Sequence, residues 1–231
     1  MHSDLRDEYL QAMGIQQWVA RTGAPAEPVP EPAAALAQDA HSPVPEDAAT
    51  LDGPALEARV AGCTQCALHE TRTRTVFGVG HQQADWLIIG EAPGADEDRA
   101  GEPFVGRAGQ LLTEILSAGG IRRADVYITN ILKCRPPGNR DPHADEVASC
   151  HAYLERQVEL LQPKLILAMG RIAAHHLLQT DIPVGRLRGT VHHYGPREIP
   201  LIVTYHPAYL LRSPLEKRKV WTDLQLARAV P

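Results

Sequence analysis

The sequence contains no uninterrupted run of the roughly 20 apolar residues that a helix needs to cross a bilayer. Its first residues, MHSDLRDEYLQAMG, also lack the basic and then apolar order of a secretory signal. The apolar fraction of 44% is ordinary for a folded domain. We therefore expect a cytoplasmic protein without a membrane partner, and we expect it to be a monomer.

Positive charge is also scarce. The formal net charge is −5, and residues 1–57 hold ten acidic residues and two arginines, a net of −8, which leaves +3 for the rest. A small positive charge on the remainder is compatible with a groove that faces phosphates, but it supports nucleic-acid binding only weakly. The motifs must therefore indicate the function.

Two glycine-rich segments, GEAPG at 90–94 and GEPFVGRAG at 101–109, are not closed by the Gly-Lys-Ser/Thr of a Walker A loop. Nucleoside triphosphate binding is therefore not expected. Between them stand Asp96, Glu97 and Asp98. Three adjacent acids can hold a divalent metal, although an exposed acidic loop is the commoner explanation.

The N-terminal quarter has a different composition from the rest. Residues 23–57 are rich in Pro and Ala, acidic and without periodicity, which is typical of a disordered linker. Residues 1–22 contain apolar residues at helical spacing and predict a short helix. An acidic extension of this kind binds a partner protein or serves only for solubility, and the sequence leaves both open.

Residues 58–231 are expected to form one α/β domain. Short β-branched runs at 85–91, 125–130, 164–170 and 199–206 alternate with helical patterns at 108–120, 144–161, 171–178 and 215–230. Strand starts 35 to 40 residues apart suit βαβ crossovers. We predict a three-layer α/β/α sandwich with a central, mainly parallel four-stranded sheet. Ligands of such folds bind beyond the carboxyl ends of the strands.

Only four cysteines are present, and Cys63 and Cys66 form a CxxC pair, while Cys134 and Cys150 follow the second expected strand. In a cytoplasmic protein this pattern favours a metal over disulfides. The spacing by itself does not separate structural zinc from a [4Fe–4S] cluster. Unlinked core cysteines and a redox CxxC pair are the remaining alternatives.

Several motifs occur together in a recognisable order, namely GEAPGADED, PFVGRAGQLL, TNILKCRPPGNRDP and HPAYLLR. With the cysteine spacing, they closely resemble those of family 4 uracil-DNA glycosylases, the iron-sulfur branch of that superfamily. The resemblance runs from about Cys63 to Arg212. It implies a repair enzyme that flips uracil out of DNA and hydrolyses its glycosidic bond, and it implies that all four cysteines ligate a [4Fe–4S] cluster.

The resemblance also implies roles for individual residues. Phe104 matches the position that stacks on the flipped base, and Asn130 matches the residue that reads the base edge. His206 matches the histidine that hydrogen-bonds uracil O2 during catalysis, and its protonation state stays open. Without the resemblance, Phe104 would be taken for a core residue. Asparagine also caps helices and makes turns, but the place of Asn130 at the carboxyl end of a central strand favours a pocket residue.

The water-activating position is less clear. Ala92 occupies the position in which some other branches of the superfamily carry a catalytic Asp. We expect Glu91 to contact the base or to position water, and Glu97 to crowd the 5-position of the base so that thymine is excluded. Both roles are hypotheses.

The segment after His206 resembles the DNA-intercalating loop of the family. Candidate wedges are Tyr209, Leu210 and Leu211, and Arg212 is expected near a phosphate. Two competing functions remain, namely a module that recognises uracil without excising it and a redox carrier. The second would require a reductase or flavin motif, and the sequence contains none.

Overall fold

The computed structural model describes residues 48–230, and the predicted helix at 1–22 lies outside this range, as does most of the predicted linker. The described part begins with η1 (Ala48–Thr50) and α2 (Gly53–Ala61). Asp52 caps α2 by accepting a hydrogen bond from the Ala55 N–H at 2.9 Å. Residues 48–57 are thus part of the folded unit, and the predicted boundary at residue 58 falls inside α2.

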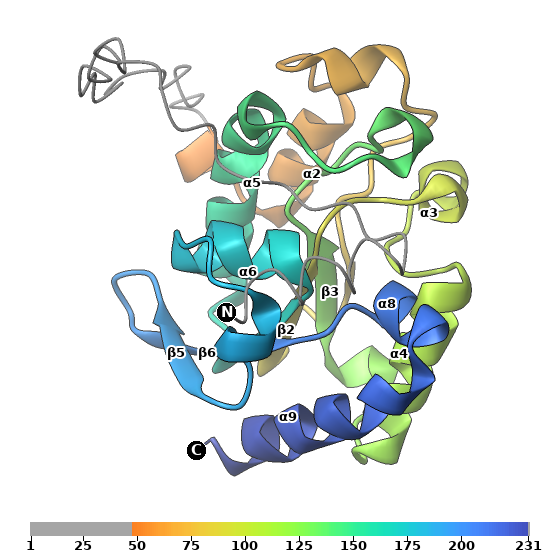
Figure 1. The fold of residues 1–231 in the computed structure, drawn as a ribbon. Helices are drawn as coiled ribbons and strands as arrows, with labels where there is room; N and C mark the ends of the chain where they lie inside the picture. The colour runs from red at the N-terminus through yellow and green to blue at the C-terminus, as the bar shows by residue number, and fades with distance from the viewer. Residues whose placement is uncertain (1–47, 231) are drawn as a thin grey trace, which may run out of the picture. The chain divides into compact units, whose positions relative to one another are not determined.

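A six-stranded sheet forms the centre of the domain (Figure 1). The strands are β1 (Val79–Gly80), β2 (Trp86–Gly90), β3 (Tyr127–Asn130), β4 (Leu165–Met169), β5 (Val191–Tyr194) and β6 (Ile199–Thr204), in the order β1-β3-β2-β4-β6-β5. The strands β3, β2, β4 and β6 are parallel, whereas β1 and β5 pair antiparallel at the two edges. The predicted mainly parallel α/β sheet is confirmed.

The sequence predicts four strands, whereas the described residues form six. The two additional strands are the edge strands β1 and β5. The strand β1 has only two residues, which is too short to give a pattern. The strand β5 has the sequence VHHY, and its residues alternate between exposed and partly buried because it covers only the edge of the sheet. Neither strand carries the continuous apolar run that marks a buried parallel strand.

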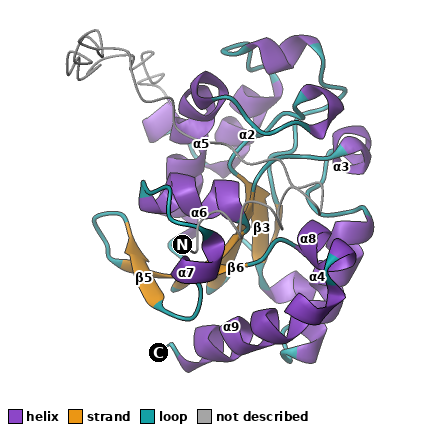
Figure 2. Cartoon of the chain, viewed as in Figure 1, coloured by secondary structure: helices purple, strands orange, loops and turns teal. Residues whose placement is uncertain are grey.

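Helices cover both faces of the sheet (Figure 2). Alternate strand residues face opposite sides, so Leu87 and Ile89 pack with α5 (Ala144–Leu161), α6 (Arg171–Leu178) and α7 (Val184–Leu187). On the other face, Ile88 packs with residues of α4 (Arg107–Ala118) and α9 (Lys217–Ala229). No helix of residues 48–230 is long and apolar enough to cross a membrane.

The remaining short elements border the ends of the strands. They are η2 (Ala67–Glu70), α3 (Ala95–Ala100), η3 (Arg123–Asp125), η4 (Pro137–Asn139), α8 (Pro207–Arg212) and η5 (Pro214–Glu216). The parallel strands β2, β3 and β6 direct their carboxyl ends to one edge of the sheet. The segments that follow them therefore meet there, as the fold class predicts.

Candidate active site and thiol cavity

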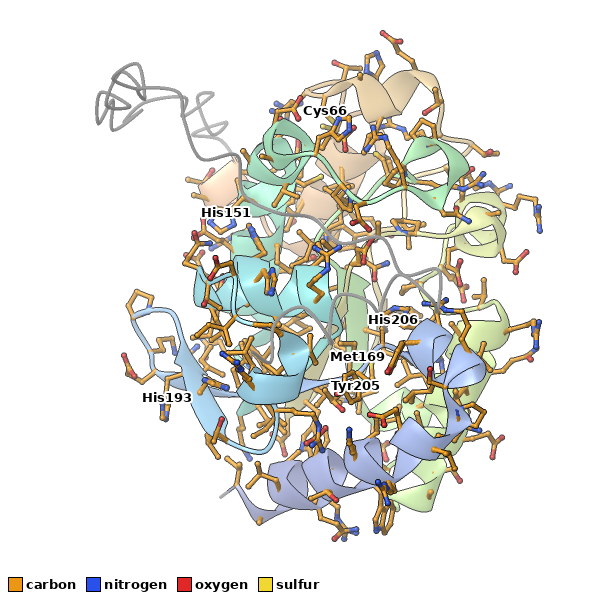
Figure 3. The ribbon with its side chains drawn as sticks, viewed as in Figure 1. Cys66, His151, Met169, His193, Tyr205 and His206 are labelled. Atoms are coloured by element: carbon orange, nitrogen blue, oxygen red, sulfur yellow. The ribbon has the colours of Figure 1, made fainter. Side chains whose placement is uncertain are left out.

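A cleft of about 1110 Å³ opens at the carboxyl edge of the sheet. Its walls include all six residues expected to contact uracil, namely Glu91, Ala92, Glu97, Phe104, Asn130 and His206. Figure 3 shows His206 where the chain enters α8. Residues up to 115 positions apart in the sequence are thereby brought to one place by the ends of β2, β3 and β6.

The base-reading and stacking candidates are packed closely. The rings of Phe104 and His206 have centroids 5.4 Å apart, with an angle of 32° between their planes. Phe104 and Asn130 both approach Gly90 at the end of β2. A Cβ atom on Gly90 would lie 2.4 Å from Asn130 Oδ1 and 2.7 Å from Phe104 Cζ. Position 90 therefore requires glycine because no side chain fits between these two residues.

His206 has a defined protonation state in this setting. Its Nδ1 accepts a hydrogen bond from the Ala208 N–H at 3.2 Å, and the residue caps α8. The pKa of His206 is lowered to about 4, mainly by burial; Glu97 raises it and Arg212 lowers it by smaller amounts. The ring is thus neutral near pH 7, and because Nδ1 is the acceptor, the proton resides on Nε2. A neutral Nε2–H donor is therefore available to a ligand.

Glu91 follows β2 directly and is partly buried. Burial raises the pKa of its carboxyl group, the carboxylate of Asp141 raises it further, and Arg171 lowers it. The backbone carbonyl of Glu91 accepts from the Leu132 N–H at 3.1 Å, which holds the segment after β2 against the segment after β3. Ala92, the next residue, supplies no ionisable group to the cleft.

Glu97 makes contacts that its sequence motif did not predict. Its Oε1 accepts hydrogen bonds from the backbone N–H groups of Val105 and Gly106, each at 3.0 Å, and its Oε2 accepts from the Gly94 N–H at 3.1 Å. These contacts join two loops that line the cleft. The exclusion of thymine by Glu97 stays a prediction.

The intercalating-loop candidates lie on α8 and differ in accessibility. Tyr209 and Arg212 line the cleft, and Leu211 is 38% exposed. Leu210 has no exposed surface and packs inside the domain, so it does not fit the role of a wedge. A wedge must project into DNA, which leaves Tyr209 and Leu211 as candidates.

The cleft contains further residues from the segment after β3 that the sequence did not single out. Pro136, Asn139 and Arg140 line its wall. Arg140 donates two hydrogen bonds to the buried carboxylate of Glu146, at 2.9 and 2.5 Å. Loop residues show no periodic pattern, so only the motif TNILKCRPPGNRDP, which contains these three residues, indicated that this loop is important.

The four cysteines line a second, smaller cavity of about 280 Å³. Cys63 and Cys66 follow α2, Cys134 follows β3, and Cys150 lies on α5. All four are free thiols. The CxxC pair thus meets the segment after β3 and the helix α5 at one place, although the described residues contain no group of His, Cys, Asp or Glu spaced to hold a single metal ion.

Burial disfavours the thiolate form of three of these cysteines. It raises the pKa of Cys66, of Cys134 and, to about 12, of Cys150. Arg72 lowers the pKa of Cys134 and Lys133 lowers that of Cys150, which partly offsets the effect of burial. Arg72 donates from Nη1 to Cys134 Sγ at 3.1 Å, and the fully buried Lys133 also lines the cavity.

Comparison with known proteins agrees with this geometry. A model of the uracil DNA glycosylase superfamily matches residues 77–225, and the chain belongs to this superfamily. Type-4 uracil-DNA glycosylases are similar to it. That of Archaeoglobus fulgidus is 45% identical over 173 residues, which cover 72% of this chain and 86% of the relative.

Two further type-4 uracil-DNA glycosylases show the same extent of similarity. The protein from Pyrobaculum aerophilum is 42% identical over 182 residues, covering 76% of this chain and 93% of its own. The protein from Thermotoga maritima is 42% identical over 175 residues, covering 74% and 90%. The resemblance inferred from the motifs is therefore confirmed.

Proposed function

We propose that this protein excises uracil from DNA and leaves an abasic site, as the first step of base excision repair. The observation that carries the proposal is the meeting of Phe104, Asn130 and a neutral His206 in one cleft at the carboxyl edge of the sheet. A base inside a duplex cannot reach such a cleft, so the uridine must be flipped out of the stack.

Recognition of the flipped base follows from the side chains present. The Phe104 ring offers a face for stacking, which contributes about 1–3 kcal/mol per base. The Asn130 carbonyl accepts from uracil N3–H, and its amide donates to O4. Cytosine presents the opposite pattern at these atoms, so both amide groups would be mispaired. A bidentate contact of this kind discriminates by about 1–3 kcal/mol.

Bond cleavage places negative charge on the base. The bond between uracil N1 and C1′ of the sugar breaks, and its electron pair stays on the base, with charge spread to O2. The Nε2–H of His206 donates a hydrogen bond to O2 and stabilises that charge, as an oxyanion-hole donor does. The positively charged sugar is then attacked by water. Water supplies hydroxide to C1′, and its proton balances the charge on uracil.

Glu91 directly precedes Ala92, the position in which some other branches of the superfamily carry a catalytic Asp. Its partly buried carboxylate lines the same cleft. We propose that Glu91 either orients the attacking water or contacts the base. If Glu91→Ala kept the full single-turnover rate, this role would be excluded.

The activity is tested with a duplex and a single strand that each contain one uracil. Purified protein is incubated with either substrate, and alkali-labile abasic sites are counted in parallel with released uracil. His206→Ala serves as the inactive comparison. The absence of product at stoichiometric protein, with intact uracil-DNA binding, would instead establish a module that recognises uracil without excising it.

We further propose that Cys63, Cys66, Cys134 and Cys150 hold a [4Fe–4S] cluster. Four thiolates are the ligand set of such a cluster, and the four cysteines line one common cavity. The hydroxyl of Tyr153 is buried at the same cavity beside Cys63, and it would find acceptors in the sulfur atoms of a cluster. The cluster would cross-link α2, the segment after β3 and α5.

Metal and sulfide analysis tests this assignment. Anaerobically purified protein is expected to contain iron and acid-labile sulfide in equal amounts, and Cys150→Ser is expected to lose both. Zinc without sulfide would contradict the cluster. An apo-protein with unchanged structure and full activity would contradict its role as a cross-link.

The location and partners of the chain stay predictions. We expect a cytoplasmic monomer whose partner is uracil-containing DNA, and whose acidic N-terminal residues contact a repair or replication protein. Deleting residues 1–40 and measuring uracil excision on naked DNA separates a catalytic role of this segment from a role in partner binding.

A further inference from the structure

Phe104 has an unusual backbone conformation. Its φ angle is +55°, in the left-handed region that residues with a side chain rarely adopt. Such a conformation persists only where the surrounding structure enforces it, and it is concentrated at functional sites. The contacts that enforce it at Phe104 come from three directions.

Arg123 holds the carbonyl side of this residue. From η3, its Nη2 donates hydrogen bonds to the carbonyl oxygens of Pro103 at 2.9 Å and Phe104 at 3.1 Å. Its Nη1 donates to Thr113 Oγ1 on α4 at 3.3 Å. The guanidinium is half-buried, and its position is fixed by the helix that follows Phe104 in the chain.

Glu97 holds the chain on the C-terminal side of Phe104. Its carboxylate accepts from the two N–H groups that follow Phe104, those of Val105 and Gly106. The third constraint comes from α4, where Gly109 lies directly against the Phe104 carbonyl. A Cβ atom on Gly109 would be 1.7 Å from that oxygen. Successive peptide groups around Phe104 are therefore fixed by an arginine, a carboxylate and a helix backbone.

We propose that Arg123 is a positioning residue for uracil excision and that it acts through Phe104, by holding the aromatic ring in the orientation that receives the flipped base. This inference depends on the stacking role of Phe104 proposed above. A ring fixed in advance loses little freedom when the base arrives, and it sets the distance of the base from His206.

The test is a double-mutant cycle on single-turnover excision of uracil from DNA. We expect Arg123→Met to lower the rate on the order of tenfold, with DNA affinity nearly unchanged. In the Phe104→Ala background, Arg123→Met is expected to have no further effect on the rate, because the aromatic ring that Arg123 positions is absent. Arg122→Met is the matched control, since Arg122 is the neighbouring arginine, its side chain is 81% exposed and it pairs with Asp125.

The rates of the single and double variants test the stacking role of Phe104 and the positioning role of Arg123 separately. If Phe104→Ala keeps the full rate, the stacking role is wrong. If Phe104→Ala is impaired and Arg123→Met is not, or if the two effects multiply in the double variant, only the positioning role of Arg123 is overturned. If Arg123→Met does not fold, Arg123→Lys replaces it in the same cycle. A lysine keeps the charge but cannot hold both carbonyl groups and Thr113 at once, so the same coupling is expected.

Discussion

The Nζ atom of Lys133 lies 2.8 Å from the carbonyl oxygen of Asn130. The same ammonium group donates to Gln157 Oε1 on α5 at 2.6 Å and to Thr129 Oγ1 at 2.7 Å. Gln157 in turn donates to the Phe77 carbonyl at 2.9 Å. This buried network connects the carboxyl end of β3, which carries Asn130, with the helix that carries Cys150.

Lys133→Met is expected to destabilise the domain by about 2–4 kcal/mol, because it leaves buried acceptors without their donor. The free energy of unfolding in urea measures the effect. Lys164→Met is the control, since the Lys164 side chain is 70% exposed and pairs with Asp85 at the surface. It should change stability by less than about 0.5 kcal/mol. Equal effects of the two substitutions would contradict the network.

His206 is expected to titrate near pH 4, where burial places its pKa. Between pH 4 and the ordinary histidine pKa of about 6.5, the unfolded chain binds more protons at this residue than the folded chain does. The contribution of His206 to stability is therefore complete above about pH 6.5 and is lost as the pH falls through 4. NMR of ring-labelled histidine, assigned with His206→Gln, measures the pKa, and a value near 6.5 would contradict the lowering of the pKa by burial.

Asn130→Asp is expected to lower single-turnover excision of uracil by about 10- to 100-fold, because a carboxylate cannot donate to O4. Binding of undamaged DNA should be unchanged, since Asn130 is 2% exposed and reached only by a flipped base. Rates on uracil-containing oligonucleotides measure the loss. A variant with wild-type rate would show that Asn130 does not read the base edge.

Gly90→Ala is expected to abolish most activity, because the added methyl group would overlap Asn130 and Phe104. Gly53→Ala is the matched control, as a Cβ atom there meets no atom within 4 Å. Excision rate and melting temperature are measured for both. Retention of full activity in Gly90→Ala would mean that the two side chains are not held where the structure places them.

The sequence predicted the parts of the fold that depend on regular patterns. The helices α5 and α6 begin and end at the expected residues, and the four parallel strands match within two residues. The edge strands β1 and β5 were missed, because their pairing depends on neighbours in space and not on an apolar run. The neutral state of His206 could not be predicted from the sequence either, since it follows from burial of the ring and from the hydrogen bond that the Ala208 N–H donates to it.

The positions of the site residues followed from recognised motifs, but their contacts did not. Glu97 was expected at the base, and it does line the cleft, but its hydrogen bonds to the backbone of two cleft loops were not predicted. Leu210 was expected at the DNA, and it is buried because α8 turns it inward. A motif predicts which residues gather, whereas the direction of each side chain is decided by the packing of its helix.

Asn130 and Cys134 are separated by four positions in one continuous segment, yet they face the base cleft and the thiol cavity respectively. The length of this segment is therefore fixed from both ends. Insertion or deletion of a single residue here would displace Asn130 from the cleft or Cys134 from the other three cysteines. We therefore expect the interval from Asn130 to Cys134 to tolerate substitutions but not changes in length.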